Sequence, residues 1–151
     1  MNLIAPLITP DTTSLDISFT SKKKLFEHAA DLFARIYGLK TSDIFTSLFE
    51  SERLGSTALG YGIAIPHGRI KDLKDACGAF YRLKTPLEFD APDNQPVSLC
   101  FILLVPKDAN ERHLQILGEL AHLFGDEAMR ASMLGAATPT DLIALLEAWS
   151  S

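Results

Sequence analysis

His67 lies between Pro66 and Gly68 at the end of an apolar run, and its imidazole is the side chain best placed to do chemistry. Proline fixes the backbone before the ring and lacks an amide donor, while glycine adds no side chain after it, so another molecule can approach the ring closely. A neutral imidazole keeps one nitrogen lone pair, which can attack phosphorus. The pattern therefore predicts an exposed nucleophile.

Four neighbours in the sequence suit a doubly charged oxyanion: Arg53, Ser56, Thr57 and Arg69. Guanidinium and hydroxyl groups both donate hydrogen bonds to phosphate oxygens. Each group also has a structural interpretation. An arginine near a helix C-terminus can interact with the helix dipole, hydroxyls can form turns or caps, and His67 itself can end a strand by hydrogen-bonding the backbone. The residues alone leave both interpretations open.

The segments around His67 resemble the active-site signature of the enzyme IIA proteins of the bacterial phosphotransferase system, in the fructose/mannitol superfamily. The resemblance is carried by an arginine, a Ser-Thr pair and then residues 62–69, GIAIPHGR. Residues 86–93, PLEFDAPD, followed by Pro96 and Val97, are similar to the nitrogen-regulatory branch. Residues 113–117, HLQIL, match the place of a second active-site histidine. With helical segments before and after, the resemblance covers nearly the whole chain.

This resemblance implies roles for individual residues. His67 would accept a phosphoryl group on Nε2 from a histidine phosphocarrier protein of the HPr type, with the proton on the other ring nitrogen directed at a backbone carbonyl. His113 would face His67 and donate a hydrogen bond to the phosphoryl group, and Arg53 would neutralise its charge. The hydroxyls of Ser56 and Thr57 would contact the phosphate.

We expect Arg69 at the rim, facing acidic groups of the partner. No metal or other cofactor is expected, because transfer between two histidines joins phosphoramidates of similar energy and arginine and amides can meet the charge. The histidines and cysteines show no metal-ligand spacing. Neither glycine-rich nucleotide motif, G-x-x-x-x-G-K-[ST] or G-x-G-x-x-G, occurs.

The nitrogen-regulatory branch implies a phosphohistidine carrier that acts mainly as a phosphorylation-dependent regulator. Its regulatory target proteins would govern potassium homeostasis or nitrogen and carbon signalling. An alternative in the same family is a sugar-transport enzyme IIA that passes phosphate to a fructose- or mannitol-type permease B domain. An alternative of another class is a protein-interaction module in which His67 is structural. Whether the chain is an enzyme depends on which of these holds.

Periodicity and caps predict the elements that position these residues. We expect helices over residues 22–37 (capped by Ser21 and ended by Gly38), 43–53 (capped by Thr41 or Ser42), 111–124, 127–134 and 138–149, and strands over residues 62–65, 78–83, 87–89 and 97–105. The short connection before residue 97 requires an antiparallel pair, and the long apolar run after it indicates a central strand covered on both faces. We therefore expect an α/β domain, a mixed sheet of about five strands with helices on both faces.

A helical projection of residues 111–124 separates two histidines. His113 shares a face with apolar side chains such as Ile116 and Leu120, whereas His122 projects toward the polar side. A histidine on an apolar face can be a satisfied core residue. Only the resemblance favours a functional His113.

Composition limits the class of protein. The 151 residues, with net charge −5, indicate one domain over residues 1–151 and argue against a nucleic-acid-binding surface. The longest apolar run, residues 97–105, is about half of a membrane-spanning helix, so no membrane insertion is expected. The N-terminus resembles no signal peptide. Cys77 and Cys100 lie in apolar segments without CxxC spacing, which is typical of reduced core cysteines in a cytoplasmic protein.

Overall fold

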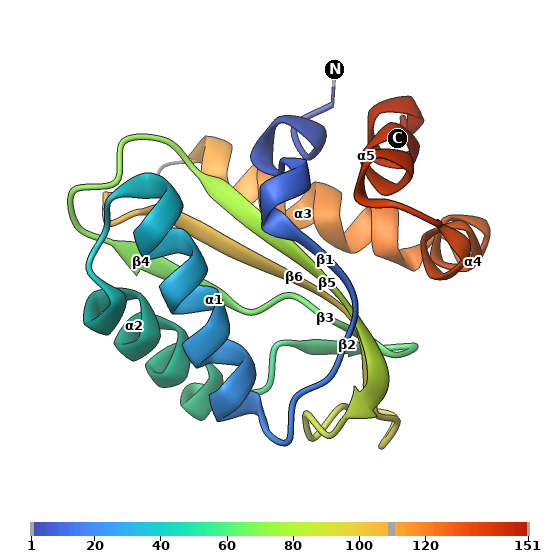
Figure 1. Cartoon of the computed structure of the whole chain (residues 1–151), viewed down its shortest axis with the longest axis horizontal. Coiled ribbons are helices and arrows are strands. Elements are labelled where there is room, and N and C mark those ends of the chain that lie inside the picture. The colour runs from blue at the N-terminus through green and yellow to red at the C-terminus, as the bar shows by residue number, and fades with distance from the viewer. Residues whose placement is uncertain (1, 109–110, 151) are drawn as a thin grey trace.

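The computed structural model describes residues 2–108 and 111–150, and in them one mixed sheet lies between two groups of helices (Figure 1). The helices are α1 (Lys22–Tyr37), α2 (Thr41–Leu54), α3 (Glu111–Gly125), α4 (Glu127–Gly135) and α5 (Pro139–Ala148), preceded by two short 3-10 helices, η1 (Ala5–Leu7) and η2 (Pro10–Thr12). The strands are β1 (Thr13–Ile17), β2 (Ala58–Gly60), β3 (Ile63–Ala64), β4 (His67–Ile70), β5 (Cys77–Leu87) and β6 (Val97–Pro106).

Strand β6 is the centre of the sheet, whose order is β1-β5-β6-β3-β2. β5 pairs with β6 in antiparallel fashion, as the short connection predicted, while β3 and β4 both run parallel to β6. β3 pairs with Leu99 and Cys100, and β4 pairs with the later residues Leu103 to Pro106. The two short strands therefore follow one another along the same side of β6, separated by Ile65 and Pro66.

Alternate side chains of β6 enter two separate hydrophobic cores. Cys100 and Ile102 pack with α1 and α2, whereas Phe101 and Leu103 pack with α3, α4 and α5. Successive residues of a strand point to opposite faces, so a continuous apolar run is needed where helices cover both. The predicted mixed α/β fold is confirmed, with six strands in the described residues rather than about five.

The helix signals were accurate, with one exception. The hydroxyl of Ser21 accepts a hydrogen bond from the Lys24 amide, and Gly38 ends α1 with φ of 68°. Helix α2 begins earlier than predicted, at Thr41, and Lys40 occupies its N-cap position with no side-chain hydrogen bond. The expected caps at Thr41 and Ser42 were therefore wrong.

The strand predictions missed the short elements. β1, β2 and β4 have no apolar run of their own long enough to reveal a strand. Residues 87–89 form no separate strand, because Leu87 ends β5 and pairs with Val97 beyond an irregularity in the register. Short strands at the side of a long one are formed by pairing, which local sequence does not encode.

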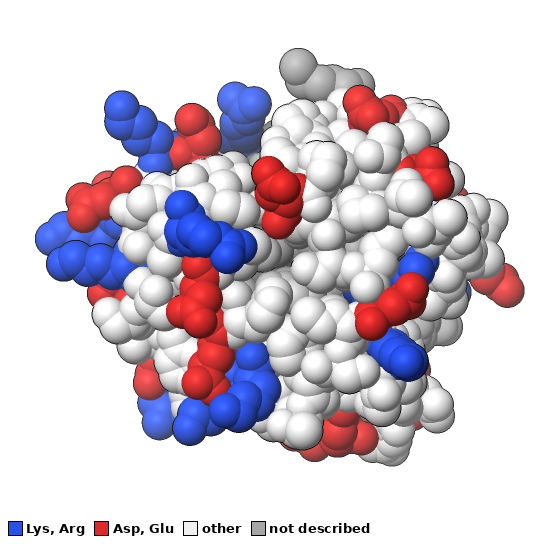
Figure 2. Space-filling model, viewed as in Figure 1, with Lys and Arg blue, Asp and Glu red and all other residues white. Residues whose placement is uncertain are grey.

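The charges in view are mixed (Figure 2), and the described helices are short or polar. Figure 2 shows Lys and Arg side chains interspersed with Asp and Glu on the face in view, without a broad patch of one sign. Among the described helices, none is both long and apolar enough to cross a membrane.

Candidate active site around His67

The ring of His67 is oriented by its own backbone. His67 is the first residue of β4 and lies opposite Leu103 of β6. Its Nδ1 lies 2.8 Å from the carbonyl oxygen of Ile65. A carbonyl oxygen only accepts hydrogen bonds, so Nδ1 carries the proton and donates it. In the neutral ring the lone pair is then on Nε2, the tautomer that a nucleophilic role on Nε2 requires.

Gly68 has a different use from the predicted one. A Cβ at this position would lie 2.6 Å from the Oγ of Ser47 on α2, so the missing side chain makes room within the molecule rather than for an approaching one. The Ser47 hydroxyl donates to the carbonyl of Arg69 and accepts from its amide, at 3.2 and 2.9 Å. Helix α2 is thereby joined to β4 directly after His67.

His67, His113 and Arg69 line one surface cavity of about 410 Å³. His113 is half-buried on the first turn of α3, and Arg69 is exposed. The remaining walls come from α2, β4, the end of β6 and α3: Ser47, Ser51, Leu54, Gly68, Val105, Leu114 and Leu117. The structure thus brings both predicted histidines and the predicted rim arginine to one opening.

A second cavity of about 560 Å³ adjoins the first, since Ser51, Leu54, His67 and Leu117 line both. It includes Ser56 and Thr57 and is otherwise largely apolar. Sequence reasoning missed this apolar rim. The sequence signal for it was Leu54, an apolar residue directly after Arg53 at the polar end of a helix. In the structure, Leu54 at the end of α2 is 88% exposed.

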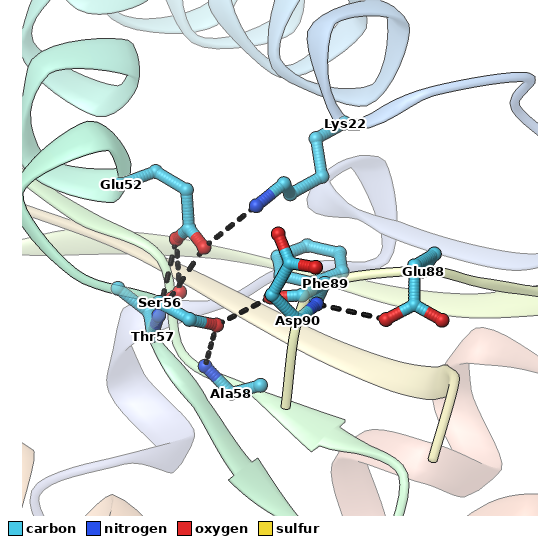
Figure 3. Close-up of polar contacts among 8 residues, drawn as sticks. All are labelled: Lys22, Glu52, Ser56, Thr57, Ala58, Glu88, Phe89 and Asp90. Carbon is cyan, nitrogen blue, oxygen red and sulfur yellow. Dashed lines mark hydrogen bonds and ion pairs between the residues drawn. The ribbon is translucent and has the colours of Figure 1, made fainter. Parts of the chain in front are cut away.

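The hydroxyls of Ser56 and Thr57 donate to other groups of the protein (Figure 3). Ser56 donates to the carbonyl of Phe89 at 2.6 Å, and its oxygen accepts from the Ala58 amide. Thr57 donates to Oε1 of Glu52 at 2.6 Å. Both residues border the cavity with His67, but their hydroxyl protons are engaged by Phe89 and by Glu52 of α2. The predicted phosphate contacts would need these hydrogen bonds to rearrange.

Arg53 is not brought to either cavity. Its guanidinium lies 2.6 Å from Oε2 of Glu50, one turn earlier on α2, and both side chains are largely exposed. It lines a separate depression with Lys22, Phe26, Phe49 and Glu52. Among the described arginines, Arg69 rather than Arg53 shares a cavity with His67.

The remaining histidines have other surroundings. Nδ1 of His28 lies 2.8 Å from the Tyr81 hydroxyl, and its ring packs edge-on against Phe19 and Tyr81. Burial lowers the pKa of His28. His122 is exposed and packs edge-on against Trp149, as its place on the polar face of α3 predicted.

The described cysteines and acidic residues offer no set of metal ligands. Cys77 and Cys100 are buried free thiols, and burial raises the pKa of Cys77 to about 12. Desolvation likewise raises the pKa of Cys100 well above its ordinary value. Within residues 2–108 and 111–150, no group of three or more His, Cys, Asp and Glu side chains could hold a metal ion.

Comparison with known proteins gives consistent matches. Residues 6–149 match the family model described as the phosphoenolpyruvate-dependent sugar phosphotransferase system, EIIA 2. A nitrogen regulatory protein of Bradyrhizobium diazoefficiens is 38% identical over 124 residues, 82% of this chain and 81% of that protein. The crystal structure of nitrogen regulatory protein IIA-Ntr from Neisseria meningitidis matches with a TM-score of 0.90 and 45% identity, covering 95% of this chain and 99% of the other. IIA mannitol from Escherichia coli matches with a TM-score of 0.77 over 92% and 98% of the chains, but its 20% identity supports a common fold alone.

Proposed function

Because the chain belongs to the EIIA 2 family of the phosphoenolpyruvate-dependent sugar phosphotransferase system, we propose that it is a phosphoryl carrier with His67 as the acceptor. The observation that carries the proposal is the 2.8 Å contact between Nδ1 of His67 and the Ile65 carbonyl, which reserves Nε2 for the phosphoryl group. The donor is a histidine phosphocarrier protein of the HPr type.

In the proposed step, the lone pair of Nε2 attacks phosphorus while the bond from phosphorus to the donor nitrogen breaks. The donor nitrogen keeps the electron pair of that bond, and the three oxygens of the phosphoryl group stay bound to phosphorus. The Nδ1 proton stays on His67, hydrogen-bonded to Ile65. The transition state is loose and spreads charge over three oxygens, so the protein contributes position and hydrogen-bond donors.

His113 and Arg69 are the side chains that would assist from within the same cavity. His113 lies at the N-terminal turn of α3, where the helix dipole favours an anion. Arg53 could contact the phosphoryl group only if its guanidinium left Glu50, with which it pairs. A phosphoryl group at His67 would compete with that exposed carboxylate for the guanidinium. Ser56 and Thr57 remain proposed contacts under the same condition.

The proposed output is regulatory. Identities of 38% and 45% to nitrogen regulatory proteins support this branch. The exposed leucines around His67, Leu54 at 88% and Leu114 at 64%, form an apolar border on which a regulatory target protein would pack. Phosphorylation adds as much as about two negative charges beside that border, which would repel an apolar or acidic partner.

The test is phosphorylation by a labelled phosphocarrier of the HPr type. Acid-labile label is expected on the wild type and none on His67→Ala. Label retained by the variant would refute His67 as acceptor, and no label on either protein would favour a binding module.

A second measurement distinguishes the regulatory role from the sugar-transport role. The labelled protein is mixed with an isolated fructose- or mannitol-type B domain. A regulator should keep its label on the time scale of its own phosphorylation, whereas rapid transfer to the B domain would support sugar transport.

A further inference from the structure

The carboxylate of Glu52 is nearly buried at the end of α2, and its contacts lead to the loop beside His67. The side chain is 6% exposed. Its Oε1 accepts the 2.6 Å hydrogen bond from the Thr57 hydroxyl, and the Thr57 amide lies 3.2 and 3.3 Å from the two carboxylate oxygens. Nζ of Lys22 lies 3.2 Å from Oε2 (Figure 3). Both oxygens are therefore satisfied.

A continuous hydrogen-bonded path runs from this carboxylate to the ring of His67. Glu52 holds the amide and hydroxyl of Thr57. The carbonyl of Thr57 accepts from the amide of Ile65 at 3.1 Å, and the carbonyl of Ile65 accepts from Nδ1 of His67 at 2.8 Å. Each residue of the path thus fixes the backbone group that holds the next one.

Stability alone does not account for a buried carboxylate. Desolvation of the charge offsets much of its attraction to Lys22, and well-packed apolar side chains often replace buried ion pairs without loss of stability. Lys22 also lies 5.2 Å from the centre of the Phe89 ring, and the Phe89 carbonyl accepts from Ser56. The Glu52–Lys22 ion pair and the packing of Lys22 on Phe89 are therefore both connected to the loop of residues 55–57.

We infer that Glu52 is a positioning residue for phosphoryl transfer, acting on His67 through Thr57 and Ile65. The inference rests on the proposed function. Its carboxylate fixes the loop, the loop fixes the Ile65 peptide, and the peptide sets the direction of the acceptor nitrogen. A displacement of the reacting group by about 1 Å can lower the rate on the order of a hundredfold.

The main test is Glu52→Gln, which keeps the size but places an amide donor opposite the donors of Thr57 and Lys22. We expect turnover of labelling by the phosphocarrier to fall by about ten- to a hundredfold. The KM for the carrier should change much less, because the apolar border around His67 is untouched. The measurement is made where circular dichroism shows the variant folded.

Three further variants, Lys22→Met, Lys24→Met and Thr57→Val, keep the test decisive. Lys22→Met leaves the carboxylate but removes its cation, and should slow turnover less than Glu52→Gln does. Lys24→Met is the matched control on the same helix, since Lys24 pairs with Glu27 and not with Glu52. In a double-mutant cycle, Thr57→Val and Glu52→Gln together should slow turnover by less than the product of their separate effects.

An independent readout separates this inference from the proposed function. Hydrogen exchange at the Thr57 and Ile65 amides, and the nitrogen chemical shifts of the His67 ring, should change in Glu52→Gln and not in Lys24→Met. Unchanged turnover in Lys22→Met and in folded Glu52→Gln would overturn the inference while leaving the carrier function intact. A wild type that takes no label, with the exchange changes still present, would overturn the carrier function and reduce the role of Glu52 to holding the loop and the ring of His67.

Discussion

His67 and His28 each form a hydrogen bond through Nδ1, but the two partners differ in whether they fix the position of the ring proton. Nδ1 of His67 and Nδ1 of His28 each lie 2.8 Å from an oxygen. The partner of His67 is a backbone carbonyl, which can only accept, whereas the partner of His28 is the Tyr81 hydroxyl, which can donate or accept. His67 also opens to a cavity shared with His113, while His28 packs among aromatic rings. Surroundings, not residue type, separate an imidazole available for the proposed chemistry from a structural one.

The largest expected effect tests the cavity side of this comparison. His113→Ala should slow labelling of His67 by about 10²–10³-fold, as expected for loss of one positioned donor to transition-state charge. His122→Ala, on the same helix but exposed and packed on Trp149, is the matched control. Labelling kinetics of both variants give the answer. Equal rates would leave His67 without an assisting histidine.

The second prediction disturbs the backbone that holds His67. In Gly68→Ala the new Cβ meets the Ser47 hydroxyl at 2.6 Å, so this hydroxyl must give up its hydrogen bonds to Arg69 or β4 and α2 must move apart. We expect a loss of about 1–3 kcal/mol in the free energy of unfolding, together with slower labelling, while the ring of His28 is unaffected. Urea unfolding and labelling kinetics measure the two effects.

The control for that variant is Gly118→Ala, because no atom outside its own helix backbone lies within 4 Å of a Cβ there. It should be neutral or stabilise α3 by at most about 1 kcal/mol. A Gly68→Ala protein as stable and as active as this control would show that the fit against Ser47 is unimportant.

The third prediction concerns the structural histidine. Tyr81→Phe removes the hydroxyl from the partner of His28 and leaves its Nδ1 without that hydrogen bond. Because His28 is half-buried, loss of this hydrogen bond should cost about 0.5–1.5 kcal/mol in the free energy of unfolding. Thermal or urea unfolding should show this loss, and labelling of His67 should be unchanged. A labelling defect would mean that the two histidines are coupled.

The smallest expected effect is a pH dependence. Burial lowers the pKa of His28 from 6.5 in the folded protein, although the nearby Asp31 carboxylate opposes the shift. The unfolded chain then binds the proton more readily, so this residue contributes a loss of stability as pH falls below about 6.5 and down to its lowered folded pKa. Urea unfolding at several pH values should show a shallower loss in His28→Phe. Parallel curves for both proteins would contradict the shift.

The sequence predicted the long elements because their signals are local. Ser21 and Gly38 marked α1 correctly, and the apolar run of β6 indicated a strand covered on both faces. β4 was not predicted, since four residues form a strand only by pairing with β6. Local pattern reaches as far as caps and periodicity, and pairing partners lie beyond it.

The same limit applies to the site. The motif marked His67, and a helical projection placed His113 on the inward face of its own helix, because both inferences use short spacings in the sequence. The sequence did not indicate that Glu52 would be buried against Thr57, or that Arg53 would pair with Glu50. Side-chain partners at a helix end depend on which rotamer and which neighbour the folded chain offers, and several are compatible with one sequence.

The anchor of His67 has a consequence for how the protein can change over generations. Every amino acid brings a carbonyl, so no replacement at position 65 can delete the group that receives the Nδ1 proton. Substitutions there can alter packing, but a carbonyl oxygen is always present at that position. A lineage can thus change the apolar border around His67 and still keep the acceptor of its Nδ1 proton.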